Sequence, residues 1–96
     1  MEIYILDIMM DNDGEYEFSR PEFLDNREAV ENYAWIRHLE FMDKYKTFAE
    51  EDSLHREKEN FLNALRQYGH VVTSDSDCKN RRIYRVIPVT IRLANY

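Results

Sequence analysis

Few side chains in this sequence have the type and spacing that chemistry requires. Glu51, His55 and Glu59 are four residues apart, so on a helix they would share one face and could hold a divalent cation. Strips of this kind are also common on solvated helix surfaces. No HExxH sequence, cysteine pair or further histidine spacing supports a metal. We therefore predict no metal site.

The run Asp11-Asn12-Asp13-Gly14-Glu15 resembles a fragment of a calcium loop. Its glycine is fourth, whereas a calcium loop needs glycine at the sixth position. Asp, Asn and Gly together are also typical of a tight turn between two strands. A hairpin turn is therefore the better interpretation of this run.

Cys78 is the only cysteine, and the neighbouring Lys79 and Arg81 would favour its thiolate. His70 precedes it by eight residues, but no third group that could orient a nucleophilic pair can be identified. The whole chain contains only two glycines, so a glycine-rich phosphate loop is absent from the sequence. We predict neither a catalytic site nor a cofactor.

Basic side chains are concentrated in the last predicted strand. Such a mixture of arginine and tyrosine could contact phosphates and stack on bases. It could equally pair with the acidic helices of the same chain, and Arg85 is then the member expected to be buried and paired. Internal pairing is the preferred interpretation, and nucleic-acid binding is the alternative, for Arg81, Arg82, Tyr84 and Arg92.

Acidic side chains gather around the first predicted turn and at the junction of two predicted helices. Carboxylates on a small rigid protein can imitate the phosphates of a duplex and occupy a basic cleft on a nucleic-acid-handling protein. The simpler interpretation is that they keep the protein soluble. The candidate partner contacts are Asp11, Asp13, Glu15, Glu17, Glu50, Glu51 and Asp52.

Trp35, Leu39 and Met42 are spaced by four and three residues and lie off the main apolar side of their predicted helix. Trp and Met are enriched at the centres of protein interfaces. This cluster is therefore the best candidate anchor for a partner or a homodimer. The alternative is a core that wraps both sides of the helix, and the sequence leaves both interpretations open.

The first elements that must position these groups are two strands. Residues 2–10 are apolar on both parities, which predicts a central strand covered on both faces. After the turn at Asp11–Gly14, residues 15–18 alternate polar with aromatic side chains, which completes a hairpin.

Helix dominates the middle of the chain, from Asp25 to Tyr68, where neither glycine nor proline occurs. Capping-box spacing occurs at Ser19 with Glu22 and at Asp25 with Glu28, and we expect the regular helix to begin near Asn26. A second capping signal, at residues 47–53, predicts a break around residues 49–52. Gly69 should end the second helix, whose inward stripe contains Leu54, Phe61, Leu62, Leu65 and Tyr68.

Two further strands are expected after the helices, at residues 71–73 and 81–93. In the last one, Ile83, Ile87 and Val89 share one parity that only Arg85 interrupts. Pro88 cannot donate to a strand ladder, so the strand should lie at an edge or bulge there. The sequence thus predicts an α+β domain in ββααββ order, with a small antiparallel sheet packed against a two-helix hairpin.

Composition bounds what this domain can be. Its 96 residues suit a single domain (1–96), and the apolar fraction of 44% is that of a globular protein. The net charge is −6 but uneven, because residues 1–60 hold 17 acidic and 7 basic side chains and residues 61–96 hold 2 and 6. The single cysteine, and an N-terminal apolar run too short to be a membrane span, predict a cytoplasmic protein.

These features favour a non-enzymatic inhibitor or adaptor that binds a basic, nucleic-acid-handling protein through its acidic surface. Small acidic inhibitors that phages carry against host systems offer an analogy. The alternative is a nucleic-acid-binding regulator that uses the basic last strand. A homodimer would be compatible with either function, and no membrane partner is expected.

Overall fold

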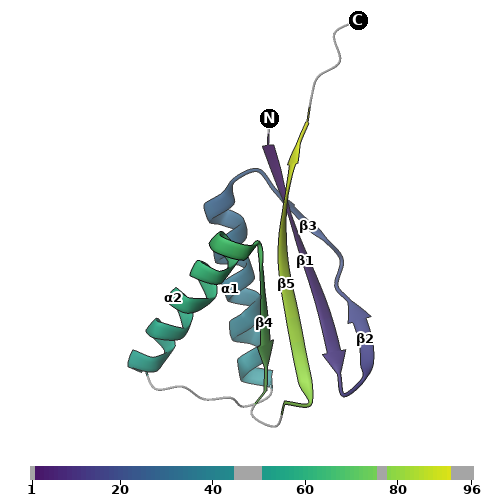
Figure 1. The fold of residues 1–96 in the computed structure, drawn as a ribbon, viewed down its shortest axis with the longest axis vertical. Helices are drawn as coiled ribbons and strands as arrows, with labels where there is room; N and C mark the ends of the chain where they lie inside the picture. The colour runs from purple at the N-terminus through teal and green to yellow at the C-terminus, as the bar shows by residue number, and fades with distance from the viewer. Residues whose placement is uncertain (1, 45–50, 76–77, 92–96) are drawn as a thin grey trace, which may run out of the picture.

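The computed structural model describes residues 2–44, 51–75 and 78–91. Within these ranges the chain forms a five-stranded antiparallel sheet and two helices, which confirms the α+β class (Figure 1). The sheet has one strand more than predicted. The elements are β1 (Glu2–Asn12), β2 (Glu15–Phe18), β3 (Glu22–Leu24), α1 (Arg27–Lys44), α2 (Glu51–Tyr68), β4 (His70–Ser74) and β5 (Asn80–Thr90).

The sheet is built on one long ladder between β1 and β5, which pair along their full lengths from Glu2↔Thr90 to Asn12↔Asn80. β4 continues the sheet beyond β5. On the other side of β1, β2 pairs with residues 9–12 and β3 with residues 4–6. β2 and β3 therefore form one interrupted edge, and the strand order is β2-β1-β5-β4.

β3 is the strand that the sequence did not predict. The spacing of Ser19 and Glu22 indicated a helix start, but Glu22 lies in β3 and Phe23 pairs with Ile5 of β1. A capping box reports only the local chain, whereas pairing with β1 satisfies the backbone of residues 22–24 across the sheet. This first helix signal was wrong.

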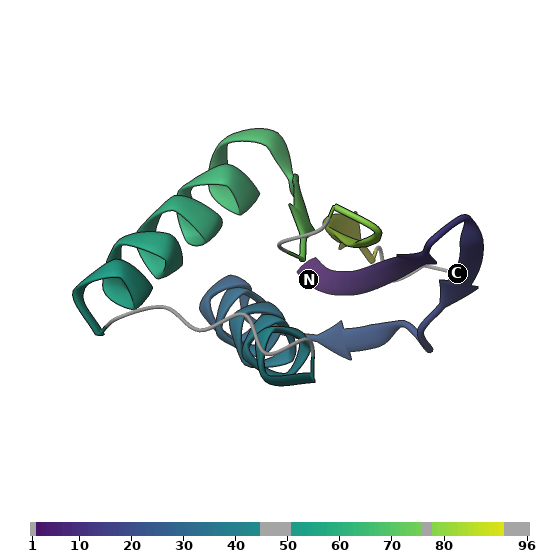
Figure 2. The same cartoon turned by 90° about the horizontal axis from the view of Figure 1, so that it is seen from below.

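Both helices cover the same face of the sheet (Figure 2). Alternate side chains of the two central strands, among them Leu6 and Tyr84, point to this face and are buried with residues from both helices. The opposite face has no described helix or strand against it. The prediction that β1 is covered on both faces was therefore wrong. The buried core cluster comprises Leu6, Ile8, Val30, Ala34, Trp35, Phe61, Leu65, Tyr84 and Val86.

The helix ends are fixed by local contacts. Asn26 caps α1, because its Oδ1 accepts a hydrogen bond from the Ala29 N–H at 3.1 Å. Gly69 follows α2 with φ +76° and donates its N–H to the Leu65 carbonyl at 3.0 Å, as predicted for a C-terminal glycine. Tyr68, expected on the inward stripe, is 65% exposed instead.

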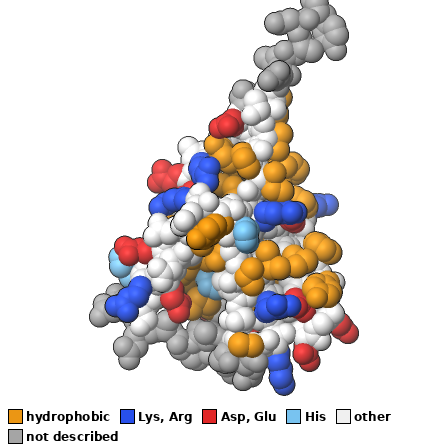
Figure 3. Space-filling model, in the orientation of Figure 1, with side chains coloured by type: hydrophobic (Ala, Val, Ile, Leu, Met, Phe, Trp, Pro, Cys, Tyr) orange, Lys and Arg blue, Asp and Glu red, His pale blue; other side chains and the backbone are white. Residues whose placement is uncertain are grey.

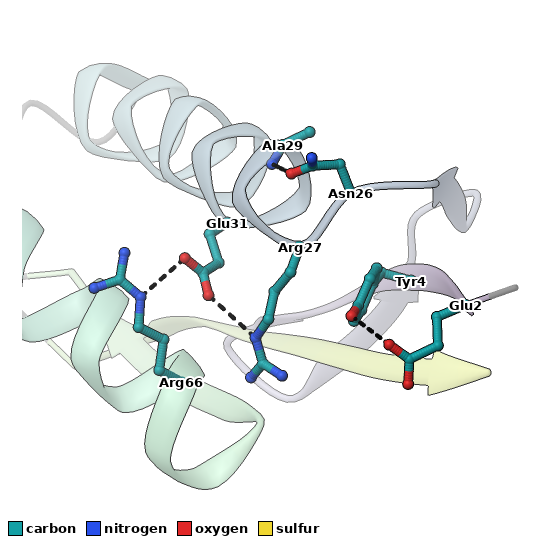
Figure 4. A network of polar contacts seen from close by, with 7 residues as sticks. All are labelled: Glu2, Tyr4, Asn26, Arg27, Ala29, Glu31 and Arg66. Carbon is teal, nitrogen blue, oxygen red and sulfur yellow. Dashed lines mark hydrogen bonds and ion pairs between the residues drawn. The ribbon is translucent and has the colours of Figure 1, made fainter. Parts of the chain in front are cut away.

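One buried carboxylate joins the two helices. Glu31 of α1 accepts hydrogen bonds from Arg66 of α2 at 2.9 Å and from Arg27 at 3.3 Å (Figure 4). The Glu31 side chain is buried while both arginines remain about half exposed to water. The arginines neutralise a carboxylate that burial would otherwise disfavour. Of the predicted break between the helices, at residues 49–52, the first two residues lie outside the described ranges and the last two already belong to α2.

Two features of the strand ends agree with the sequence. Asp13 (φ 53°) and Gly14 (φ 95°) form the tight turn between β1 and β2, since positive φ at both central residues suits the twist of a hairpin. Pro88 lies beyond the end of β4. The Val86 N–H on the β4 side of β5 donates to the Gly69 carbonyl at 2.8 Å. Pro88, two residues further on, faces the same side but lies opposite no described strand there.

Neither helix in the described ranges has the length and apolar character that a membrane crossing requires.

Candidate functional site

The arginines on the outward face of β5 are neutralised by carboxylates of β1. Arg81 binds Asp11 at 2.5 Å and Arg85 binds Asp7 at 2.6 Å, each pair lying directly opposite in the β1–β5 register. The hydrogen bond from Arg81, with a second from the Gly14 N–H, lowers the pKa of Asp11. Arg85 is paired, but with a strand carboxylate rather than with the acidic helices as predicted, and its side chain is 58% exposed, so its expected burial was wrong.

The remaining members of the basic strand point toward the helices. Arg82 donates to the Arg37 carbonyl at 3.1 Å, and its guanidinium lies 4.8 Å from the centre of the Phe41 ring. Tyr84 is fully buried, so its ring cannot stack on a base. Arg92 lies outside the described residues. The two described arginines of the nucleic-acid alternative, Arg81 and Arg82, and the neighbouring Arg85 therefore all have internal partners.

A buried histidine forms the most unusual polar group of the core. His38 stacks on Phe61 with the ring centres 5.0 Å apart, and its Nδ1 is 3.4 Å from the Tyr84 hydroxyl. Burial, and secondarily the charge of Arg82, lower the pKa of His38 to about 4. Burial raises the pKa of Tyr84 to about 12, so both groups stay neutral around pH 7. The sequence analysis did not identify this cluster.

His38 also borders an open cavity of about 220 Å³ between α2 and β4. Met42, Phe61 and Val71 supply its apolar walls, and Glu57 and Thr73 are among its polar lining. In the described ranges, no group of three or more His, Cys, Asp or Glu side chains has an arrangement that could hold a metal ion. The described lining of the cavity thus includes one imidazole, His38, and one carboxylate, Glu57.

The groups considered for chemistry in the sequence lie apart from one another. His55 contacts Glu59 at 3.3 Å on the solvent side of α2, while the side chain of Glu51 lies outside the description. Cys78 is exposed in the loop before β5, with its Sγ 4.0 Å from the Ser74 hydroxyl. His70 instead contacts the Tyr68 carbonyl through Nδ1 at 3.2 Å.

The predicted acidic contacts divide into several environments. Asp11 is buried in its ion pair with Arg81, so it does not belong to the open acidic surface. Asp13, Glu15 and Glu17 are exposed at the hairpin. Glu50 lies outside the described residues, and only the backbone of Glu51 and Asp52, in the first turn of α2, is described. Their assembly with the hairpin carboxylates therefore stays a prediction.

One acidic residue at this edge was missed. Glu22 of β3 lies opposite Leu6, and Glu15 and Glu17 of β2 lie opposite Asn12 and Met10, so all three point to the same side of the interrupted edge. All three are exposed, and no ion pair connects them to another described side chain. The signal was hidden because Glu22 had been interpreted as a helix cap.

The Trp35 cluster belongs to the core. Trp35 is 6% exposed and Met42 is 7% exposed. Leu39 is partly buried and packs against the core. Trp35 meets Phe61 of α2 edge-on, with the ring centres 5.4 Å apart. Of the two interpretations left open above, the structure thus supports the core, and the cluster offers no exposed anchor to a partner.

Exposed apolar side chains lie instead on the uncovered face of the sheet, which we call the open face. Figure 3 views the molecule with this face turned partly to the front, where hydrophobic side chains gather over the strands and basic ones interrupt them. A shallow cavity of about 260 Å³ lies on it between Asp7, Met9, Phe18, Ile83 and Arg85. The apolar side chains of the open face are Ile3, Ile5, Met9, Tyr16, Phe18, Phe23, Val72, Ile83, Ile87 and Val89.

Comparisons with models of known families, with curated proteins and with solved structures find no match to this chain. Function must therefore be argued from the surfaces just described.

Proposed function

We propose that the protein is a non-enzymatic interaction module, an inhibitor or adaptor that binds the basic surface of a nucleic-acid-handling protein in the cytoplasm. In this proposal its acidic edge occupies part of the surface that nucleic acid would contact. The analogy with small acidic inhibitors of viral origin is consistent with such a role.

The observation that supports the proposal is a difference in pairing: the described arginines of β5 have partners within the chain, whereas the carboxylates at the edge formed by β2 and β3 have no described basic partner. Arg81, Arg82 and Arg85 each bind a carboxylate or a backbone carbonyl within the chain. The carboxylates of the interrupted edge bind no described basic side chain, so their field extends into solvent. We call this set, Asp13, Glu15, Glu17 and Glu22, the acidic edge.

The acidic edge suits a protein partner better than a ligand that is itself anionic. Along one strand, alternate side chains on the same side are about 7 Å apart, so Glu15 and Glu17 present a regular pair of charges on a rigid support. Complementary charges of this kind mainly accelerate association and select the partner. Arg20, between β2 and β3, is the one exposed basic residue within this stretch of the described chain.

The test compares two triple variants that remove the same charge from different places. In the first, Glu15→Gln, Glu17→Gln and Glu22→Gln neutralise the acidic edge. In the second, Glu28→Gln, Glu57→Gln and Glu59→Gln neutralise exposed carboxylates on the helices. Each tagged protein is used to capture partners from its native cell lysate, with and without nuclease, at low and at moderate salt.

We expect the wild type and the helix variant to retain one nuclease-resistant, basic protein partner that moderate salt releases. With that partner purified, the edge variant should bind at least about tenfold more weakly at low salt. Equal binding by both variants would contradict the assignment to the acidic edge. Recovery of nuclease-sensitive RNA or DNA without a persistent protein would contradict the proposal and support the nucleic-acid alternative.

A further inference from the structure

The open face is more apolar than an ordinary solvent-exposed sheet surface. On β5, the outward parity holds Ile83, Ile87 and Val89, whereas the parity beneath the helices includes Arg82 and Thr90. At the edges, Phe18 is 70%, Phe23 66% and Val72 53% exposed. Apolar side chains gathered on one exposed face, here around two ion pairs, are typical of an interaction site.

We propose that a second copy of this chain covers the open face, so that two sheets pack face to face in a symmetric homodimer. The contact is separate from the acidic edge, whose glutamates point to the other side of the sheet. It also differs from the dimer anchor expected at Trp35, which the structure buries.

Charge is the first argument for a second copy. The open face carries two ion pairs, Asp7 with Arg85 and Asp11 with Arg81, and its acidic and basic charges are thus equal. The chain as a whole has a net charge of −6. A strongly basic or acidic partner would gain little from a balanced face, whereas an identical face offers matching apolar surface and no unbalanced charge at the contact itself.

The position of the central ion pair is the second argument. The β1–β5 ladder runs from Glu2↔Thr90 to Asn12↔Asn80, so Asp7↔Arg85 is its midpoint. Apolar pairs lie on either side of it, Ile5↔Ile87 toward one end and Met9↔Ile83 toward the other. A two-fold axis through the midpoint superposes apolar on apolar regions and places Asp7 of each copy beside Arg85 of the other.

The size of the face is the third argument. β1 and β5 are each 11 residues long, and the sheet is four strands wide. The other two positions are shorter, with 5 residues in β4 and 7 in β2 and β3 together, so at about 3.4 Å per residue and about 4.8 Å between strands the face covers roughly 550 Å². Stable interfaces bury about 600 to 1,000 Å² on each partner, so the open face approaches the lower end of the area that a specific dimer needs. Face-to-face packing of two antiparallel sheets is also a common architecture.

The first experiment measures the mass of the untagged protein by sedimentation equilibrium from about 1 to about 100 µM. We expect wild type to approach twice the 11.7 kDa of the chain. Phe23→Glu and Val72→Glu should each raise the dimer dissociation constant at least about tenfold, because both place a charge in the apolar contact. Ile36→Glu is the matched control, since Ile36 is 51% exposed on α1 and should leave the constant within about twofold.

The second experiment exchanges the central charges and does not depend on the stability of a single variant. Asp7→Lys makes the centre of the face positive and Arg85→Glu makes it negative, so each variant alone should be monomeric. An equimolar mixture should form a heterodimer at least about tenfold tighter than either homodimer, because opposite charges again meet across the two-fold axis.

Several results would overturn the proposal. Wild type that keeps the mass of one chain at the highest concentration excludes the dimer. A dimer that survives both sheet-face substitutions, or that Ile36→Glu weakens equally, excludes the open face as the contact. If both charge variants are folded by circular dichroism and their mixture stays monomeric, the two-fold axis does not pass through Asp7 and Arg85.

Discussion

His38 shows how a single residue can make the stability of this protein depend on pH. Its imidazole is packed among Trp35, Phe61 and Tyr84, and burial lowers its pKa from 6.5 to about 4. Between these two values the unfolded chain binds a proton that the folded protein excludes. The contribution of neutral His38 to the free energy of unfolding is therefore fully present above pH 6.5 and is lost as the pH falls toward about 4.

We predict that this one group lowers the free energy of unfolding by about 2 kcal/mol between about pH 7 and about pH 5. His38→Phe keeps an aromatic ring in the stack and removes the titration, so its unfolding free energy should change much less over the same range. Urea denaturation at several pH values measures both. Equal pH dependence in the two proteins would contradict the assignment.

Asp11 is the second residue whose role depends on its surroundings. In the sequence it is one of several carboxylates in an acidic run, but the structure buries it between Arg81 and the Gly14 N–H. The carboxylate accepts hydrogen bonds from both, which ties the hairpin turn to β5 across 70 positions in the chain. Its function is therefore structural, and it leaves the acidic edge to its neighbours.

At the scale of the element, the start of α1 separates two residues that look alike in the sequence. The capping box predicted from the sequence used Asp25 and Glu28, whereas the observed cap is Asn26, whose side chain accepts from the Ala29 N–H. A shift of one position thus decides which side chain accepts a hydrogen bond from the unpaired N–H groups of the first helical turn.

Replacement of each residue tests this cap. We expect Asn26→Ala to lower the free energy of unfolding by about 1 kcal/mol, the usual cost of removing a capping side chain. Asp25→Ala, one residue earlier, should change it by less than about 0.5 kcal/mol. Urea denaturation with unchanged slope would measure the difference. A larger loss for Asp25→Ala would favour the cap predicted from the sequence.

β5 illustrates why an element can be predicted and yet be oriented wrongly. Its strand character and the edge position of Pro88 follow from local chemistry. Ile83 and Ile87 share its more regular apolar parity, and Arg85 within that parity was expected to be buried. The structure turns this parity outward and buries Tyr84 and Val86 instead.

At the scale of the whole molecule, two surfaces of different character lie on different sides of the sheet. The acidic edge is charged and would attract a basic partner, whereas the open face is apolar and electrically balanced. The net charge of −6 changes the affinity of the two contacts in opposite directions. It favours association with a basic protein and opposes association of two identical chains.

The two proposed contacts should therefore respond oppositely to salt. Between about 0.05 M and about 0.5 M salt, screening should weaken binding of a basic partner and tighten the homodimer. Sedimentation equilibrium of the protein alone, and titration with the captured partner, would give the two trends. A homodimer that weakens with salt would show that charge attraction, rather than apolar burial, holds it together.

The sequence by itself determined the elements whose causes are local. The tight turn at Asp13 and Gly14, the end of α2 at Gly69 and the beginning of α1 near Asn26 each depend on residues within one turn of chain. The α+β class follows from the same periodicities. These features were predicted correctly because backbone conformation and nearby hydrogen bonds are sufficient to fix them.

Only the tertiary structure decided which surfaces are buried. Periodicity shows that a strand has two faces but not which face meets the helices, so the burial of Trp35 and Tyr84 and the outward direction of Ile83 could not be read from spacing. β3 forms because its backbone pairs with residues 4–6 of β1. The pairing of Asp7 with Arg85 depends on the β1–β5 register, which joins residues 78 positions apart. Contacts between distant segments fix these features, and through them the candidate interaction surfaces.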